Sequence, residues 1–122
     1  MSIKAIIPQI RTTDMASSID FYTNKLGFTV EFTYQDFYAG IRAGEQVIHL
    51  KLVDEKDPSI DFVDQGDHFH LYLQTDDVNE VATRLKQLDV DIAEDVHDTD
   101  WNTRELVVYD DQGHTLYFGQ AI

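Results

Sequence analysis

The chain contains no cysteine, so disulfide bonds and thiolate chemistry are excluded. Positive charge is also scarce: 9 Lys and Arg stand against 23 Asp and Glu, a formal net charge of −14. A field of this sign repels nucleic acid and anionic membranes and attracts cations. The chain has no apolar run near the roughly 18 residues of a membrane span, and no signal-peptide cleavage pattern. We therefore expect a cytoplasmic protein with neither nucleic acid nor membrane as a partner.

Common catalytic motifs are absent as well: the chain has no glycine-rich phosphate loop, no G-x-S-x-G elbow and no H-E-x-x-H helix. What remains is the composition of an ordinary globular protein, with 122 residues of which 43% are hydrophobic, and this length predicts a single domain. Much of the acid lies in residues 53–67 and 91–100. These segments are either solvated acidic loops or an attractive field for a cationic ligand.

The two halves of the chain resemble each other. At a constant offset of 62 residues, Asp14 aligns with Asp76, and apolar residues at helical spacing follow both. Each aspartate is a predicted N-cap, because a short carboxylate can accept a hydrogen bond from a first-turn amide. Gly27 and Asp89 predict where the two helices end.

The remaining segments alternate in hydrophobicity with period two and predict strands. They cover residues 4–11, 29–34, 37–42, 46–52, 68–74, 90–93, 104–109 and 114–118. The order of elements predicts an α+β protein. It forms one domain, residues 1–122, from two βαβββ modules at about residues 1–60 and 61–122.

The alternation separates two kinds of side chain in the predicted strands. One face is apolar, as with Phe69, Leu71 and Leu73, and can pack under the helices. The opposite face carries imidazole and phenol rings, contributed by His49, His68, His70, Tyr72 and Tyr117. Such a face is either half-solvated without further role or, if the sheet curves, the lining of a cup.

Residues 12–28 and 103–119, together with the duplicated plan, resemble the vicinal oxygen chelate superfamily, which includes glyoxalases, bleomycin resistance proteins and dioxygenases. The pattern D-x-x-x-S-x-x-F-Y-x-x-x-L-G-F, which begins at Asp14, carries much of this likeness. The resemblance implies two βαβββ modules that form curved mixed sheets around a cup, paired in a homodimer.

In the enzymes of this superfamily a divalent metal is bound from four strands, and the resemblance places those positions at Ile7, His49, His70 and Tyr117. Isoleucine has no ligating atom, and a phenol, with an ordinary pKa near 10, is a poor substitute for a carboxylate. Only His49 and His70 remain where about three protein ligands are usual. We expect no cofactor, with a divalent ion held by these two histidines as the alternative.

Within the superfamily, residues 36–50, Pro8 and the pair Trp101 and Asn102 resemble bleomycin resistance proteins. This implies sequestration of a cationic or aromatic small molecule without chemistry, by a homodimer. The alternative is a metal-dependent enzyme of the superfamily: a glyoxalase-type lyase, a thiol transferase or an extradiol dioxygenase. A third possibility is a binder of an unrelated metabolite, since one fold hosts many functions.

No catalytic residue is assigned, because stacking and a negative field suffice to bind a flat cation. Trp101 is expected to be partly exposed, since its neighbours are acidic and polar. The direction of Glu105 stays undecided, because it alternates with the apolar Val107. The predicted ligand-binding residues all carry a ring: Phe37, Tyr38, His49, His68, His70, Tyr72, Trp101 and Tyr117.

Overall fold

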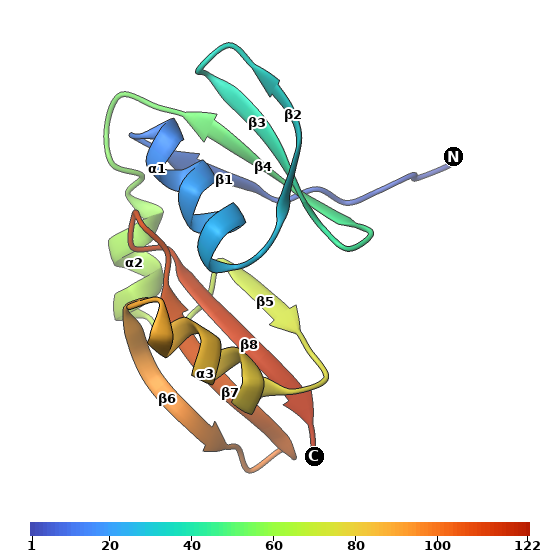
Figure 1. The fold of residues 1–122 in the computed structure, drawn as a ribbon, viewed down its shortest axis with the longest axis vertical. Helices are drawn as coiled ribbons and strands as arrows, with labels where there is room; N and C mark the ends of the chain where they lie inside the picture. The colour runs from blue at the N-terminus through green and yellow to red at the C-terminus, as the bar shows by residue number, and fades with distance from the viewer. The chain divides into compact units, whose positions relative to one another are not determined.

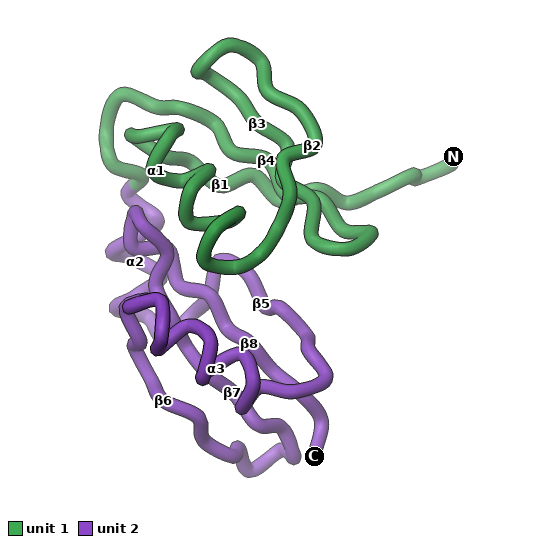
Figure 2. Tube along the Cα trace, viewed as in Figure 1, with its two compact units in different colours: residues 1–57 green, residues 58–122 purple.

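The computed structural model describes residues 1–122 and divides them into two compact units, Met1–Asp57 and Pro58–Ile122 (Figures 1 and 2). Unit 1 contains β1 (Gln9–Thr12), α1 (Met15–Asp20), η1 (Phe21–Lys25), β2 (Thr29–Tyr34), β3 (Tyr38–Ala43) and β4 (Gln46–Leu52). Unit 2 contains α2 (Ser59–Gln65), β5 (Leu71–Gln74), α3 (Val78–Gln87), β6 (Ile92–Asp98), β7 (Thr103–Tyr109) and β8 (Thr115–Ala121). No helix has the length and apolar character needed to span a membrane.

Each unit is built on one four-stranded mixed sheet, which confirms the predicted α+β class. The strand orders are β1-β4-β3-β2 and β5-β8-β7-β6. In both sheets the first strand of the unit runs parallel to the last, and the other neighbours are antiparallel. The predicted bounds of β2 and β4 are correct, whereas β1 was expected over residues 4–11 and begins at Gln9. Pro8 precedes it and has no N–H to donate to a ladder, although its carbonyl accepts a hydrogen bond from His49 N.

The apolar alternation buries one face of each sheet as expected. In unit 1 the side chains of Ile10, Ile41 and Leu50 are buried on the same face as the buried helix residue Tyr22. In unit 2 the corresponding residues are Val78, Leu85, Leu106, Val108 and Leu116. Burial of each such side chain contributes on the order of 1.5–3 kcal/mol, so this face holds each unit together and leaves the opposite face available.

Helices α1 and α3 each begin at a carboxylate cap. Asp14 accepts a hydrogen bond from Ser17 N at 3.0 Å, which confirms it as an N-cap. The prediction for Asp76 is wrong: the cap of α3 is Asp77, which accepts from Glu80 N at 3.0 Å. The second module has two consecutive aspartates, and an ungapped alignment selects the first.

A single extra residue explains that error. The caps Asp14 and Asp77 lie 63 positions apart, whereas Gly27 and Asp89, which end the helices with φ of 79° and 57°, lie 62 apart. The additional residue of unit 1 is taken up by the π-helical turn η1, in which Leu26 N donates to Phe21 O. Such turns are rare and accommodate one-residue insertions. The predicted helix ends are therefore correct. At the helix starts, the predicted alignment of the two modules is shifted by one residue.

Residues 53–67 were expected to be a loop, but part of this acidic segment is the helix α2. Pro58 has φ −60°, which suits the first turn of a helix, where a missing N–H costs nothing. Ile60 is buried and anchors the helix on unit 2. The second acidic segment is likewise more ordered than expected, since β6 extends to Asp98.

The turn between β7 and β8 is held by a buried pair. Asp110 accepts a hydrogen bond from the backbone N of His114 at 2.8 Å, and its carboxylate lies 2.8 Å from Nδ1 of the same histidine. Both side chains are almost fully buried. Gly113 supplies the positive φ of 97° that the turn requires. This turn determines where β8 starts and therefore the register of its side chains.

The two adjacent aspartates before α3 provide a matched test. We expect Asp77→Ala to lower the free energy of unfolding by about 1 kcal/mol, because a first-turn amide loses its acceptor. Asp76→Ala should change it by less than half as much, since exposed Asp76 caps nothing. Chemical denaturation followed by circular dichroism measures both. Equal losses would contradict the assignment of the cap.

Candidate functional site

The face of sheet β5-β8-β7-β6 opposite α3 is the candidate site; we call it the open face of unit 2. Registers place its residues together: Tyr72 lies beside Tyr117 on β5 and β8, Tyr117 beside Val107 on β7, and Gly119 beside Glu105. The alternation that buries Leu116 and Phe118 under the helix directs Tyr117 and Gly119 to this face.

Three aromatic rings form a cluster on the open face. Phe69 lies with its ring centroid 5.7 Å from that of Tyr72 and 5.3 Å from that of Tyr117, and the two tyrosines are 6.3 Å apart. The rings are tilted or edge-on to one another, the arrangement that aromatic pairs favour. Phe69 is 49% exposed and Tyr72 39% exposed, so part of this aromatic cluster is accessible to a ligand.

A buried carboxylate lies beside the aromatic cluster. Glu105 is only 5% exposed and accepts hydrogen bonds from Tyr72 Oη at 2.8 Å and Thr103 Oγ1 at 3.1 Å. No Lys or Arg pairs with it. The register opposite Gly119 settles its direction, which the sequence left undecided: Glu105 belongs to the open face.

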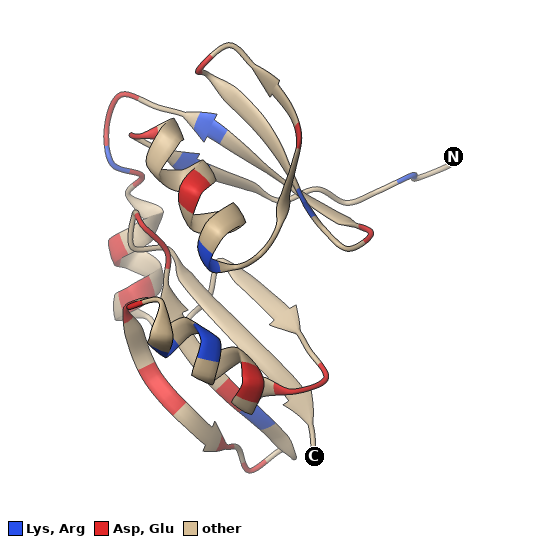
Figure 3. Ribbon diagram, viewed as in Figure 1, with Lys and Arg blue, Asp and Glu red and all other residues tan.

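The charge of the chain is concentrated in unit 2, which holds 15 of the 23 acidic residues and 3 of the 9 basic ones. Acidic segments are prominent on α2 and β6 (Figure 3). Two of the cations are engaged in exposed pairs, Lys86 with Asp95 and Arg104 with Asp98, each at 2.8 Å. The hydrogen bond from Arg104 lowers the pKa of Asp98. Unit 2 as a whole therefore carries a strong negative charge.

The pKa values of the two phenols in the aromatic cluster are raised, first by burial and then by nearby carboxylates. Burial, followed by the hydrogen bond to Glu105 and the charge of Glu105, raises the pKa of Tyr72 to about 12. The pKa of Tyr117 is raised by burial and then by the charges of Glu94, Asp67 and Glu105. Both phenols are therefore neutral at physiological pH, and neither supplies an anionic ligand atom there.

His70 is turned toward α2 rather than toward the aromatic cluster. Its Nδ1 accepts a hydrogen bond from Thr115 N at 3.1 Å, so in the neutral ring Nε2 carries the proton, and Nε2 lies 3.1 Å from Ser59 Oγ. The ring packs edge-on against buried His114 at 4.7 Å. Both ring nitrogens are thus engaged: Nδ1 by the first residue of β8, and Nε2 by α2, a helix that the sequence did not predict.

Two other predicted residues lie at the margins of unit 2. His68 stacks on Phe62 of α2, with ring centroids 6.4 Å apart. Trp101 is 68% exposed in the turn between β6 and β7, as its neighbours predicted. Neither ring contacts the aromatic cluster.

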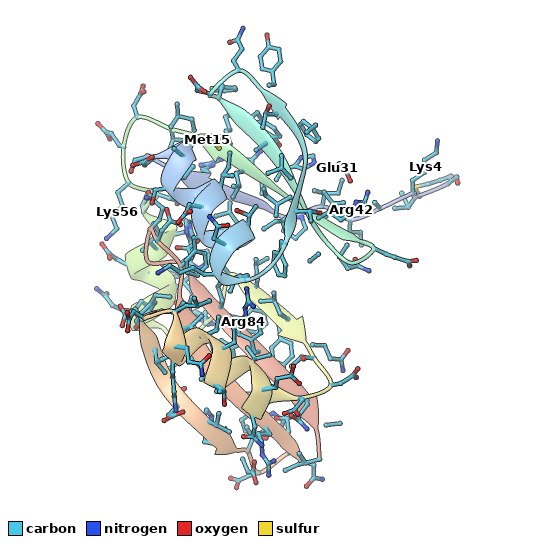
Figure 4. All side chains as sticks on the ribbon, viewed as in Figure 1. Lys4, Met15, Glu31, Arg42, Lys56 and Arg84 are labelled. Carbon is cyan, nitrogen blue, oxygen red and sulfur yellow. The ribbon has the colours of Figure 1, made fainter.

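Unit 1 presents a second, separate group of rings on the face of its sheet opposite α1. Tyr38 Oη lies 3.0 Å from His49 Nδ1 and accepts a hydrogen bond from Gln9 Nε2 at 3.1 Å. Phe32 lies edge-on to His49 at 5.4 Å. The ring centroid of Phe37 lies 6.4 Å from that of Tyr38, and the Lys51 ammonium lies over the Phe37 ring. At the far edge of the same face, Glu31 and Arg42 form an ion pair across β2 and β3 (Figure 4).

The positions that the resemblance assigned to a divalent metal do not fit one. Ile7 precedes β1 and has no ligating atom, both ring nitrogens of His70 are engaged, and Tyr117 is a neutral phenol. No group of three or more His, Asp and Glu side chains is arranged to hold an ion. Of the two assigned histidines, His49 alone keeps a ring nitrogen, Nε2, without a hydrogen bond to the protein.

Sequence reasoning missed Phe69 and left Glu105 undecided. Phe69 was expected on the apolar face, but β5 begins only at Leu71, so strict alternation does not extend to it. For the approach of Tyr72 to β8 a signal was present in Gly119, because a glycine within a strand often marks the close approach of another group. A Cβ on Gly119 would lie 1.8 Å from the phenol oxygen of Tyr72.

A family model described as Glyoxalase/Bleomycin resistance protein/Dioxygenase superfamily matches residues 4–118. No curated protein matches the chain in sequence.

Solved structures share the fold. A bleomycin resistance determinant encoded on the transposon Tn5 has a TM-score of 0.77 at 19% identity, with 98% of each chain covered. The bleomycin-binding protein of Streptomyces verticillus, complexed with copper(II)-bleomycin, has a TM-score of 0.72 at 17% identity, with 97% of this chain and 96% of the other covered. Lactoylglutathione lyase from Agrobacterium tumefaciens has a TM-score of 0.76 at 15% identity, with 98% of this chain and 95% of the other covered. At these identities the similarity shows a shared fold and no more.

The bond between Tyr72 and Glu105 can be tested by titration. We expect Glu105→Gln to lower the pKa of Tyr72 from about 12 toward 10 without reaching it, because the charge is removed while burial, the largest cause, remains. NMR of the tyrosine ring carbons measures this value. Glu80→Gln on α3 removes the same charge elsewhere and serves as the control. An unchanged pKa of Tyr72 in Glu105→Gln would show that the hydrogen bond between Tyr72 and Glu105 is not formed in solution.

Proposed function

Because the chain belongs to the Glyoxalase/Bleomycin resistance protein/Dioxygenase superfamily, we propose that it binds a cationic or aromatic small molecule and releases it unchanged. The observation that carries this proposal is the exposed aromatic cluster of Phe69, Tyr72 and Tyr117 beside the buried Glu105. Rings of this kind stack on a flat ligand, and the carboxylates around them favour a positive one.

The strength expected of such a site is modest for each contact. An aromatic pair contributes about 0.5–1.5 kcal/mol beyond the area it buries, and a cation over a ring a similar amount when exposed. The three rings together would support specific binding without any covalent step. The second group of rings, Tyr38, His49 and Phe37 in unit 1, is a separate candidate surface for an aromatic ligand.

Sequestration of a bleomycin-type glycopeptide is the concrete version of this proposal. Its support is the acidic charge of unit 2, the aromatic cluster and the fold shared with a bleomycin-binding protein and a bleomycin resistance determinant. An unrelated aromatic or cationic metabolite would use the same features. We also propose a homodimer, since exposed apolar side chains such as Val30, Phe32 and Tyr34 of β2 are typical of a surface that a partner covers. We further propose that it has no metal cofactor, since both ring nitrogens of His70 are engaged.

Calorimetric titration with metal-free bleomycin tests the concrete version. We expect micromolar binding that Phe69→Ala weakens roughly fivefold, because about 1 kcal/mol of stacking is lost. Phe62→Ala removes an even more exposed phenylalanine that stacks only on His68, and should leave the affinity unchanged. The absence of heat with the wild-type protein would overturn antibiotic sequestration, and equal losses in both variants would remove the aromatic cluster from the proposed site.

Native mass spectrometry of protein purified without chelator tests the cofactor and the assembly together. We expect the mass of a dimer with no stoichiometric divalent ion, because His70 is engaged and Ile7 cannot ligate. A divalent ion at one per chain would instead favour the metal-dependent lyase, transferase or dioxygenase, with His49 as its first ligand to mutate. A monomer mass would overturn the proposed dimer.

A further inference from the structure

The two hydrogen bonds to Glu105 end on the same atom. Tyr72 Oη and Thr103 Oγ1 both donate to Oε2, at 2.8 Å and 3.1 Å. Oε1 accepts no hydrogen bond from the protein. This oxygen keeps some contact with solvent. One oxygen of a largely buried carboxylate is therefore left open as an acceptor.

This arrangement is incomplete as a structural device. A buried carboxylate costs several kcal/mol unless its charge is compensated, and a carboxylate offers about four lone-pair positions. Two neutral hydroxyl donors occupy only part of that capacity and bring no positive charge. Arg104, the nearest cation along β7, points to the opposite face and pairs with Asp98. A purely structural Glu at this place would gain more from a cation of the protein itself.

The backbone is shaped to hold Tyr72 over this carboxylate. A Cβ at position 119 would lie 1.8 Å from the Tyr72 oxygen and 2.4 Å from Cζ, so only glycine admits the ring. Glycine within a strand weakens it, and here that cost allows the phenol to cross β8 and reach Oε2. Tyr72 thereby positions Glu105 through Oε2 and presents its own ring on the same open face.

We propose that Oε1 of Glu105 is the receptor for a planar cationic N–H group, an amidinium or guanidinium carried on an aromatic ligand. This inference rests on the proposed ligand-binding function and names the ligand class. The flat group donates an N–H to Oε1 while its ring lies against the aromatic cluster of Phe69, Tyr72 and Tyr117. Tyr72 and Thr103 act as positioning residues, because they hold the carboxylate through Oε2 and leave Oε1 for the ligand.

Two small probes of the same shape separate charge from stacking: benzamidine, which is cationic, and benzamide, which is neutral. A hydrogen bond to a charged group contributes enough to give the wild-type protein about a tenfold preference for benzamidine in an NMR titration. In Glu105→Gln this preference should fall to about one, while benzamide binds as before. The Gln side chain can still accept from Tyr72 and Thr103, and thermal unfolding checks that the fold is kept.

Glu94→Gln is the matched control, since Glu94 also lies on the open face, opposite Val107, and the substitution removes the same charge. It should keep most of the tenfold preference. An equal loss in Glu94→Gln and Glu105→Gln would show a general field and overturn the receptor. Should Glu105→Gln fail to fold, the carboxyl carbon shift of Glu105 in the wild type decides: it must respond to benzamidine and not to benzamide.

The outcomes distinguish this inference from the function on which it rests. Binding of both probes with equal affinity by the wild type overturns the receptor at Glu105 and leaves aromatic binding standing. Binding of neither probe overturns the proposed binding function as well.

Discussion

The open face of unit 2 depends on the register of three strands, β5, β8 and β7. The parallel pairing of β5 with β8 places Tyr72 beside Tyr117, and the antiparallel pairing of β8 with β7 places Gly119 beside Glu105. Because side chains alternate at every residue, a slip of one position would move the apolar set to this face and bury the polar one. The same register therefore builds the core under α3 and the candidate site opposite it.

That register is held from both ends of β8. At its start, the buried pair of Asp110 and His114 closes the turn from β7, and at its end Gly119 admits the ring of Tyr72. Helix α2 then covers one end of the face by engaging His70 and, through Asp64, the phenol of Tyr109. The accessible rings of the face, Phe69 and Tyr72, lie close to carboxylates, and this combination is expected to suit a flat cation rather than an anion or a metal.

The duplicated plan was readable because helices and strands leave periodic patterns, and most predicted elements are present. The errors have local causes. The π-helical turn η1 adds one residue to the helix of unit 1, so Asp76 was aligned where Asp77 is the cap. Helix α2 was taken for a loop because acidic residues dominate its segment and only Ile60 shows its buried side. Of the proposed site, Tyr72 and Tyr117 followed from alternation, whereas Phe69 did not, because it lies just before the strand begins.

The sequence by itself determined the α+β class, the duplicated module, the acidic charge and the two faces of each sheet, because these depend on composition and on periods of 2 and 3.6 residues. Only the tertiary structure decided the direction of Glu105, the engagement of His70 and the closeness of Tyr72 to Gly119. These depend on which strands lie side by side and on a helix packed across the sheet. Such contacts join residues as far apart as Tyr72 and Glu105, and no local pattern along the chain records them.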